Sequence, residues 1–252
     1  MRNVYIAFWG WVALWLVMPA QGETLARRLI ATYEKVDTVS CEIRRDIGNS
    51  EGEMRWLSRV HFARPDKLHV ENYAPLPRRI IADGVTMFQY NEGQPRGFRQ
   101  SIDQLPDAMI HNLRKVPGTA MEHLFRIADM PEDELEDGEE PFPVRRGYAT
   151  TTLYVVLHAD AQGRLGRLEL YDVKKRDVLT ARVDFENFEE VVEGVWIPMA
   201  HHGTYIMGDV TSEEVIRLSD YQANKAIDAK LFDADAYFED VEWVSRFEDL
   251  AQ

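Results

Sequence analysis

Cysteine is almost absent from this chain, which has Cys41 as its only cysteine among 252 residues. One cysteine cannot form an internal disulfide, so an ordinary apolar core must hold the fold together. Cys41 alternates with Val39 and Ile43, and this pattern predicts a small buried side chain rather than a nucleophile. The length of the chain is sufficient for one domain with such a core.

The sequence also lacks the marks of the common catalytic sites. It contains no H-E-x-x-H metal motif, no G-x-x-x-x-G-K-[ST] phosphate loop and no dinucleotide fingerprint, and no nucleophile elbow is expected. His201 and His202 form one suggestive pair, but adjacent residues on a strand point to opposite faces, so both rings cannot easily bind one metal. We therefore predict a protein that is not an enzyme and needs no metal or cofactor.

Basic residues are in a clear minority, with 29 Lys and Arg against 43 Asp and Glu and a net charge of −14. A surface of this sign repels phosphate backbones and anionic lipid headgroups, so nucleic-acid binding is disfavoured. The segment 131–141 is almost wholly acidic and too poor in apolar residues to join a core, which predicts a solvated loop insertion. A Ca²⁺ site is the sharper alternative there, but the ordered D-x-D-x-D-G spacing is missing.

The longest apolar run lies at the amino terminus, from Val4 to Met18. With Arg2 before it and Ala20-Gln21-Gly22 after it, this run predicts a cleaved secretory signal over residues 1–22. The alternative is a retained transmembrane anchor, but the run is shorter than the ~20 apolar residues of a span. Cleavage would leave residues 23–252 as a single exported domain, and loss of Arg2 would make its net charge one unit more negative.

Apolar spacing then predicts one helix followed mainly by strands. Residues 24–36 have apolar side chains at helical spacing, with Thr24 as a plausible cap. From Thr38 onward the period changes to two, so that Met54, Trp56, Val60 and Phe62 share one face of a strand. Further strands are predicted at 67–73, 79–82, 86–90, 97–101, 148–159, 165–172, 180–188, 195–205 and 211–221, and two short helices at 102–113 and 119–127. The fold class is therefore α+β, dominated by one strongly curved antiparallel sheet.

The stretch from Arg64 to Asn91 has the most specific pattern. Arg64-Pro65 closes a strand, a proline follows the next strand, an apolar strand ends in Asp83-Gly84, and an aromatic-x-Tyr-Asn strand comes after it. In this order the features resemble the LolA/LolB-like family of periplasmic outer-membrane lipoprotein carriers. The local physics agrees, because Asp-Gly is a turn pair and a residue before proline is biased to extended backbone.

The resemblance implies a half-barrel whose curved sheet encloses an apolar cavity closed by short helices. It places Arg64 at the arginine that holds the helical lid closed and releases cargo, and Leu68 at the cavity mouth. Without the resemblance, Arg64 reads as a surface arginine at a strand end. The residues expected to line the cavity are Met54, Trp56, Val60, Phe62, Leu68, Val70, Phe88 and Tyr90, although a filled core would use the same residues.

Three classes of function remain open. The first, implied by the resemblance, is a monomeric periplasmic carrier of acylated lipoprotein or other lipid cargo, with an inner-membrane donor and an outer-membrane acceptor as partners. The second is a lipid- or peptide-sensing regulatory module on the same fold. The third is a hydrolase with an unrecognised site, for which the many acidic pairs give no specific support.

Overall fold

The computed structural model describes residues 23–49, 52–138 and 140–251, and the predicted signal lies outside this part of the chain. Three α-helices are present in it: α1 (Leu25–Tyr33), α2 (Asp107–Arg114) and α3 (Met121–Ile127). No helix among the described residues is long and apolar enough to cross a membrane.

The predicted first helix is confirmed as α1. Thr24 is its N-cap, and the Thr24 hydroxyl accepts a hydrogen bond from Arg27 N at 3.3 Å. The helix predicted over 102–113 is instead divided into a 3₁₀ turn η1 (Ile102–Gln104) and α2. Leu105 between them is extended because it precedes Pro106, and a residue before proline is disfavoured in the helical region.

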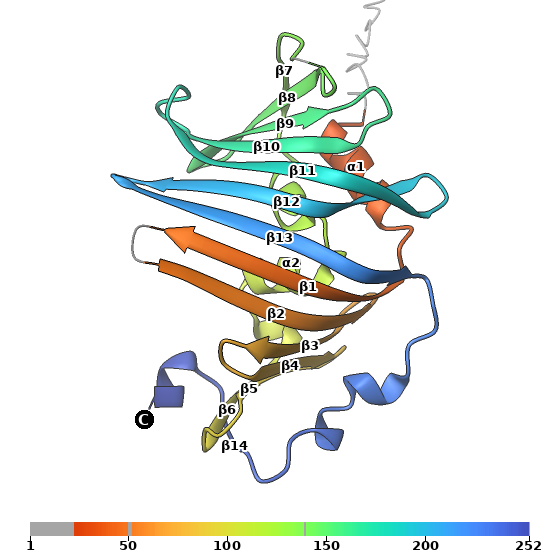
Figure 1. Ribbon diagram of the computed structural model, residues 1–252, viewed down its shortest axis with the longest axis vertical. Coiled ribbons are helices and arrows are strands. Elements are labelled where there is room, and N and C mark those ends of the chain that lie inside the picture. Colours follow the sequence, from red (N-terminus) through yellow and green to blue (C-terminus); the bar gives the residue numbers. More distant parts are fainter. Residues whose placement is uncertain (1–22, 50–51, 139, 252) are drawn as a thin grey trace, which may run out of the picture.

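Fourteen strands form a single sheet in the described residues, in the order β14-β6-β5-β4-β3-β2-β1-β13-β12-β11-β10-β9-β8-β7 (Figure 1). All neighbours pair antiparallel except β14 and β6. The strands are β1 (Thr38–Asn49), β2 (Gly52–Ala63), β3 (Lys67–Ala74), β4 (Arg78–Asp83), β5 (Thr86–Asn91), β6 (Arg96–Ser101), β7 (Glu132–Glu134), β8 (Val144–Ala149), β9 (Leu153–Ala159), β10 (Leu165–Asp172), β11 (Leu179–Val192), β12 (Val195–Met207), β13 (Val210–Ala223) and β14 (Glu242–Val244). The predicted α+β class with a dominant antiparallel sheet is confirmed.

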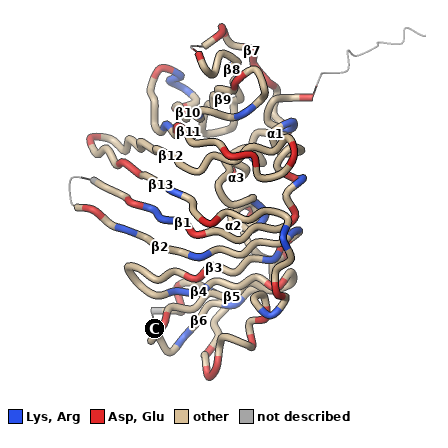
Figure 2. Tube along the Cα trace, turned by 45° about the vertical axis from the view of Figure 1, so that its right-hand side comes forward, with Lys and Arg blue, Asp and Glu red and all other residues tan. Residues whose placement is uncertain are grey.

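The helices pack against one face of this sheet, here called the helix face (Figure 2). Side chains from the sheet and the helices form one buried cluster there, which includes Cys41, Val60 and Leu168 from strands and Leu29 and Leu124 from helices. Cys41 is 3% exposed, and burial raises the pKa of its thiol to about 12. The predicted role of Cys41 as a small core residue is therefore confirmed.

The acidic segment is more structured than a solvated loop. Glu132–Glu134 form the edge strand β7, and the Glu132 carboxylate accepts hydrogen bonds from Leu25 N at 2.6 Å and from the Tyr148 hydroxyl. Arg146 lies 3.2 Å from the same carboxylate. Composition could not reveal this role, because it depends on a helix terminus 107 residues away in the chain.

The chain after β13 crosses the opposite face of the sheet. This C-terminal tail, residues 225–251, contains η2 (Ala229–Phe232), η3 (Ala234–Ala236), β14 and η4 (Phe247–Ala251). We call the surface that it covers on β3 to β6 the tail face. Tyr237 packs on His69 with ring centroids 4.8 Å apart, and Trp243 packs on Phe88 at 5.3 Å. The tail then adds β14 to the sheet edge, and Phe247 stacks on Phe98 at 3.9 Å.

Candidate functional site

A pocket of about 320 Å³ lies between the helix face of the central strands and the chain that joins α2 to α3. This volume is at the lower end of the usual range for ligand pockets, roughly 300–1,000 Å³. Its wall on the sheet is mainly apolar, and its wall on the helices is mainly polar. The lining residues are Ile43, Arg45, Trp56, Ser58, Val60, Leu68, Val70, Asn72, Arg78, Asn112, Lys115, Pro117, Gly118, Thr119, Glu122, His201, Ile216 and Leu218.

Four of the eight residues predicted to line a cavity are in this wall: Trp56, Val60, Leu68 and Val70. Strand register brings them together, because Val60 pairs with Val70 and Phe62 with Leu68 across β2 and β3. Phe62 is on the same face but is fully buried in the core cluster and does not line the pocket.

The other three predicted lining residues lie elsewhere. Met54 is near the start of β2, and it is 50% exposed. Phe88 and Tyr90 are on the tail face, where Phe238 contacts both rings at centroid distances of 6.3 and 5.9 Å. On β5 the helix face is instead occupied by Met87, which belongs to a small buried cluster with Ala82 and Phe98.

Two ion pairs include charged residues that line the pocket: Arg45, Lys115 and Glu122. The Arg45 guanidinium bonds the Glu214 carboxylate, which also accepts a hydrogen bond from the Tyr205 hydroxyl at 2.9 Å. Lys115 Nζ donates to Glu122 Oε1 at 2.8 Å. Burial opposes ionisation of Glu122, but Lys115 and His123 hold its pKa below the ordinary value. Both acids are therefore matched by a cation.

Arg78 is the third cation of the pocket. Its guanidinium lies over the Trp56 ring, 5.9 Å from the centroid. The hydrogen-bond network favours an Asn72 amide whose oxygen accepts from Arg78 Nε and Nη2 at 3.0 Å each, while its nitrogen donates to Ser58 Oγ at 2.5 Å. Arg78 was not among the predicted site residues, because an arginine at the end of a strand is usually a solvated surface residue. Its position opposite Asn72 in the β3–β4 register is visible only after strand pairing is known.

His201 and His202 point to opposite faces, as predicted from the alternation of a strand. His201 is buried in the pocket wall, and its Nε2 lies 3.1 Å from the Gly118 carbonyl oxygen. His202 faces outward near Glu186, at 3.6 Å. Across the described ranges, no three His, Cys, Asp or Glu side chains gather closely enough to hold a metal ion.

Burial lowers the pKa of His201 to about 4, below its ordinary value near 6.5. The unfolded chain therefore binds more protons than the folded protein between these pH values, and stability should fall as pH falls through this window. Between pH 7 and pH 5 we expect the wild type to lose on the order of 1–2 kcal/mol more than a His201→Gln variant. Urea unfolding at both pH values measures this difference. The neighbouring His202→Gln is the control, and an equal loss in both variants and the wild type would contradict the prediction.

Arg64 joins the end of β2 to the end of α1. Its Nε donates to the Val36 carbonyl at 2.9 Å and its Nη2 to the Tyr33 carbonyl at 3.4 Å. These acceptors follow or end α1, so the direct contact of Arg64 is with α1 rather than with α2 or α3. The next turn motif, Asp83-Gly84, connects β4 to β5. Gly84 has a φ of +103°, and Asp83 Oδ1 accepts from Val85 N and Thr86 N at 2.8 Å each.

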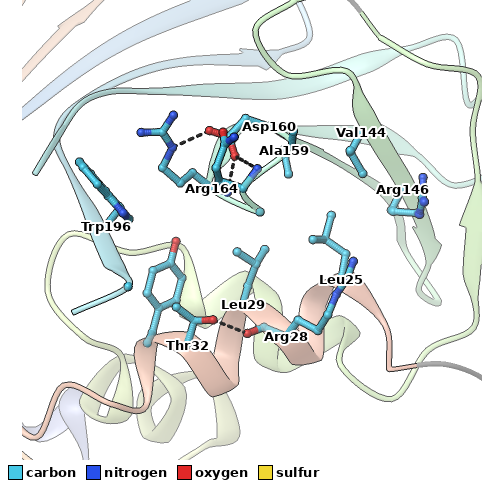
Figure 3. Close-up of a pocket in the computed structure, with 15 residues that line it drawn as sticks. Leu25, Arg28, Leu29, Thr32, Val144, Arg146, Ala159, Asp160, Arg164 and Trp196 are labelled. Carbon is cyan, nitrogen blue, oxygen red and sulfur yellow. Dashed lines mark hydrogen bonds and ion pairs between the residues drawn. The ribbon is translucent and has the colours of Figure 1, made fainter. Parts of the chain in front are cut away.

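A second pocket, of about 480 Å³, lies between α1 and the turns β9–β10 and β11–β12 (Figure 3). Leu25 and Leu29 of α1 form part of its floor, and Arg164 and Trp196 stand on the opposite side. Arg164 Nε donates to Asp160 Oδ2 at 2.5 Å, and its guanidinium lies 5.2 Å from the Trp196 ring. Arg164 therefore has its own carboxylate partner.

The expectation about the nucleophile-elbow motif needs correction. The sequence from Gly48 to Gly52 does read G-x-S-x-G, although no nucleophile elbow was expected. In a hydrolase this motif connects a strand to a helix. Here it connects β1 to β2, which pair antiparallel with Asn49 opposite Gly52, and residues 50–51 lie outside the described part. The expected context of the motif is therefore absent among the described residues.

No family model and no curated protein sequence matches this chain. Among solved structures, it is similar to a "putative outer membrane lipoprotein-sorting protein domain" from Vibrio parahaemolyticus, with 14% identity and a TM-score of 0.60 over 84% of this chain and 95% of that chain. It is also similar to a DUF1329 family protein from Desulfovibrio piger, with 15% identity and a TM-score of 0.55 over 84% and 95% of the two chains. These likenesses confirm the predicted LolA-like fold.

Proposed function

We propose that this protein is a periplasmic carrier that holds an acyl chain of lipoprotein or a related lipid cargo in the pocket beneath α2 and α3. The observation that carries the proposal is the continuous apolar wall of Val60, Leu68 and Val70 on the helix face, next to a pocket large enough for a chain. A buried apolar wall of this kind stabilises a bound chain by about 0.8 kcal/mol per CH₂. The fold shared with a lipoprotein-sorting domain supports the same role.

The carrier role includes export and exchange. Residues 1–22 would be removed as a secretory signal, and the mature monomer would receive cargo from an inner-membrane donor and pass it to an outer-membrane acceptor. Catalysis is not part of the proposal. The polar pairs near the pocket are each mutually neutralised: Arg45 with Glu214 joins β1 to β13, and Lys115 with Glu122 joins the C-cap of α2 to α3.

A displacement assay tests the proposal. An environment-sensitive apolar dye should bind the mature protein with a stoichiometry near one, and a diacylated lipopeptide should displace it, because both use the same apolar wall. Reproducible hydrolysis of the lipopeptide would instead favour the hydrolase alternative. Failure of the lipopeptide to displace a bound dye would reject the carrier.

Leu68→Glu should weaken dye and lipopeptide binding about 10-fold or more without unfolding the protein. Leu68 is only partly buried at the pocket wall, so the new carboxylate can stay hydrated while it repels an apolar chain. The matched control is Leu76→Glu, because Leu76 is 68% exposed and away from the pocket. Fluorescence titration measures binding and circular dichroism measures folding. Unfolding of Leu68→Glu alone would identify Leu68 as a core residue.

A further inference from the structure

The charge of Arg78 is unusual for its position. The side chain is partly buried in the pocket wall beside Trp56, and burial lowers the pKa of its guanidinium. An arginine remains protonated in proteins even so, because its ordinary pKa exceeds 12. A partly desolvated cation is normally matched by a carboxylate. Among the described residues, none forms an ion pair with Arg78, and Asn72 is its only side-chain hydrogen-bond partner.

The other charged residues of the pocket do not provide Arg78 with a carboxylate partner. Arg45 is paired with Glu214, and Lys115 with Glu122. The nearby His201 is neutral at pH 7, since burial lowers its pKa to about 4. The pocket wall therefore has one positive charge in excess, although the whole chain has a net charge of −14. A local charge opposite to the global one marks a place where an anion is favoured.

The Arg78 guanidinium also has N–H donors that Asn72 does not use. Arginine has five N–H donors, and the Asn72 oxygen takes two of them. Three remain, in the planar arrangement that suits a carboxylate or phosphate. Asn72 is itself held by Ser58, and Trp56 lies against the guanidinium, so the group is oriented before any ligand arrives.

Apolar residues of β2 and β3 line the pocket next to Arg78. Strand pairing places Ser58 beside Asn72 and Val60 beside Val70, so the polar pair and the apolar pair are successive steps along the same face of β2 and β3. Leu68 and Val60 continue the pocket wall beyond them. A ligand with an anionic head at Arg78 would therefore have its chain on the apolar wall.

We propose that the cargo of this pocket is an anionic single-chain amphiphile, whose carboxylate or phosphate head is bound by Arg78 and whose chain lies along Val60, Val70 and Leu68. The inference rests on the proposed acyl-chain binding and narrows it. The volume of about 320 Å³ favours one chain over the two or three of an intact lipid anchor.

The experiment compares three ligands of equal chain length: dodecanoate, dodecyl phosphate and neutral dodecanol, each displacing the apolar dye below its micelle concentration. The unaltered protein should bind at least one of the anions about 10- to 100-fold more tightly than the alcohol, as expected for a hydrogen bond to a charged group. Arg78→Gln should abolish this preference, so that neither anion binds more tightly than dodecanol. The control Arg59→Gln removes the same charge from an exposed arginine paired with Glu42, and should keep the preference.

The outcomes separate head recognition from chain binding. Tighter binding of dodecanoate points to fatty acids and tighter binding of dodecyl phosphate to phospholipid-derived cargo, and both support the proposal. Equal binding of all three ligands, or a preference that survives Arg78→Gln, overturns it while the carrier function stands. If neither these ligands nor the diacylated lipopeptide displaces the dye, the carrier function fails as well. The comparison on the unaltered protein holds even where Arg78→Gln does not fold.

Discussion

A chain that ends at Asn224 is expected to lose at least about 5 kcal/mol of its free energy of unfolding, a large part of the 5–15 kcal/mol typical of a domain. The deleted tail provides the aromatic partners of the tail face. Phe238 contacts Phe88 and Trp243, with centroids 6.3 and 5.2 Å apart, and loss of one such ring by truncation usually costs about 3–5 kcal/mol. Urea unfolding measures the loss.

Deletion should also uncover apolar surface that is unrelated to the pocket. Ile81 is fully buried although it lies on the tail face opposite His69 in the β3–β4 register. Phe98 would lose its stacking partner Phe247. We therefore expect the shortened chain to bind additional apolar dye that the lipopeptide does not displace, and to aggregate at lower concentration.

A point substitution can displace the tail without removing it. A Cβ added to Gly97 would stand 2.6 Å from Trp243 Cζ3 and 3.0 Å from Val241 Cγ1, so Gly97→Val should push β14 from the sheet edge. Gly48→Val is the matched control in another strand, because its nearest neighbour would be 3.9 Å away. If Gly97→Val and the shortened chain are both as stable as the wild type, the tail is not part of the folded unit.

The tail also explains why Phe88 and Tyr90, two of the predicted lining residues, lie away from the pocket. Alternation in β5 separates Met87 from Phe88 and Tyr90 correctly, but both faces of this strand have apolar side chains. Sequence alone cannot decide which face meets the helices when a distant segment covers the other one. On β2, in contrast, the outward neighbours Arg55 and Arg59 are charged, and the inward face was predicted correctly.

The polar part of the site was beyond sequence reasoning for a related reason. Arg45, Arg78 and Glu214 are ordinary surface residues by type, and each reaches the helix face only because of the register of its strand. Register depends on bulges, such as those between Ser40 and Glu42 and between Leu57 and Ser58, which leave no clear mark in the sequence. Short signals with a local cause, the Thr24 cap and the Asp83-Gly84 turn, were predictable.

Arg64→Met is the second change that we expect to have a large effect on stability. The guanidinium donates to the carbonyl of Val36, three residues beyond α1, and to that of Tyr33, the last residue of α1, whose oxygen also accepts from Val36 N at 3.1 Å. A hydrogen bond from a charged donor contributes about 1.5–3 kcal/mol, and the longer bond to Tyr33 adds little. We expect the variant to lose about 2–3 kcal/mol of its free energy of unfolding. Urea unfolding measures this loss.

The control Arg59→Met removes an exposed arginine from the same strand. Its salt bridge to Glu42 is on the surface, where such pairs contribute about 0–1 kcal/mol, so this variant should remain close to the wild type. Arg64→Lys should be intermediate, because an ammonium can reach one carbonyl but cannot reproduce the fork of the guanidinium. Equal losses in Arg64→Met and Arg59→Met would reduce Arg64 to a surface arginine.

Helix α1 connects Arg64 indirectly to the segment that lines the pocket. At the other end of this helix, Arg27 Nε donates to the Ala128 carbonyl just after α3, and its guanidinium pairs with Asp129 at 2.5 Å. The chain leading into α3 supplies Gly118 and Thr119 to the pocket wall. A lid that opens for cargo needs states that differ by only a few kcal/mol, and an arginine at the far end of α1 can bias them on that scale.

Handover should therefore suffer more than uptake in Arg64→Met. If the proposed carrier function holds, the variant weakens the contacts of Arg64 to α1 that would favour an empty closed state, and it leaves the apolar wall of the pocket unchanged. A two-stage assay with labelled lipopeptide compares loading of the protein with transfer to acceptor vesicles, and we expect near-normal loading with transfer slowed about 10-fold. If loading and transfer both match the wild type in a variant that has lost stability, Arg64 holds α1 to β2 but plays no part in cargo release.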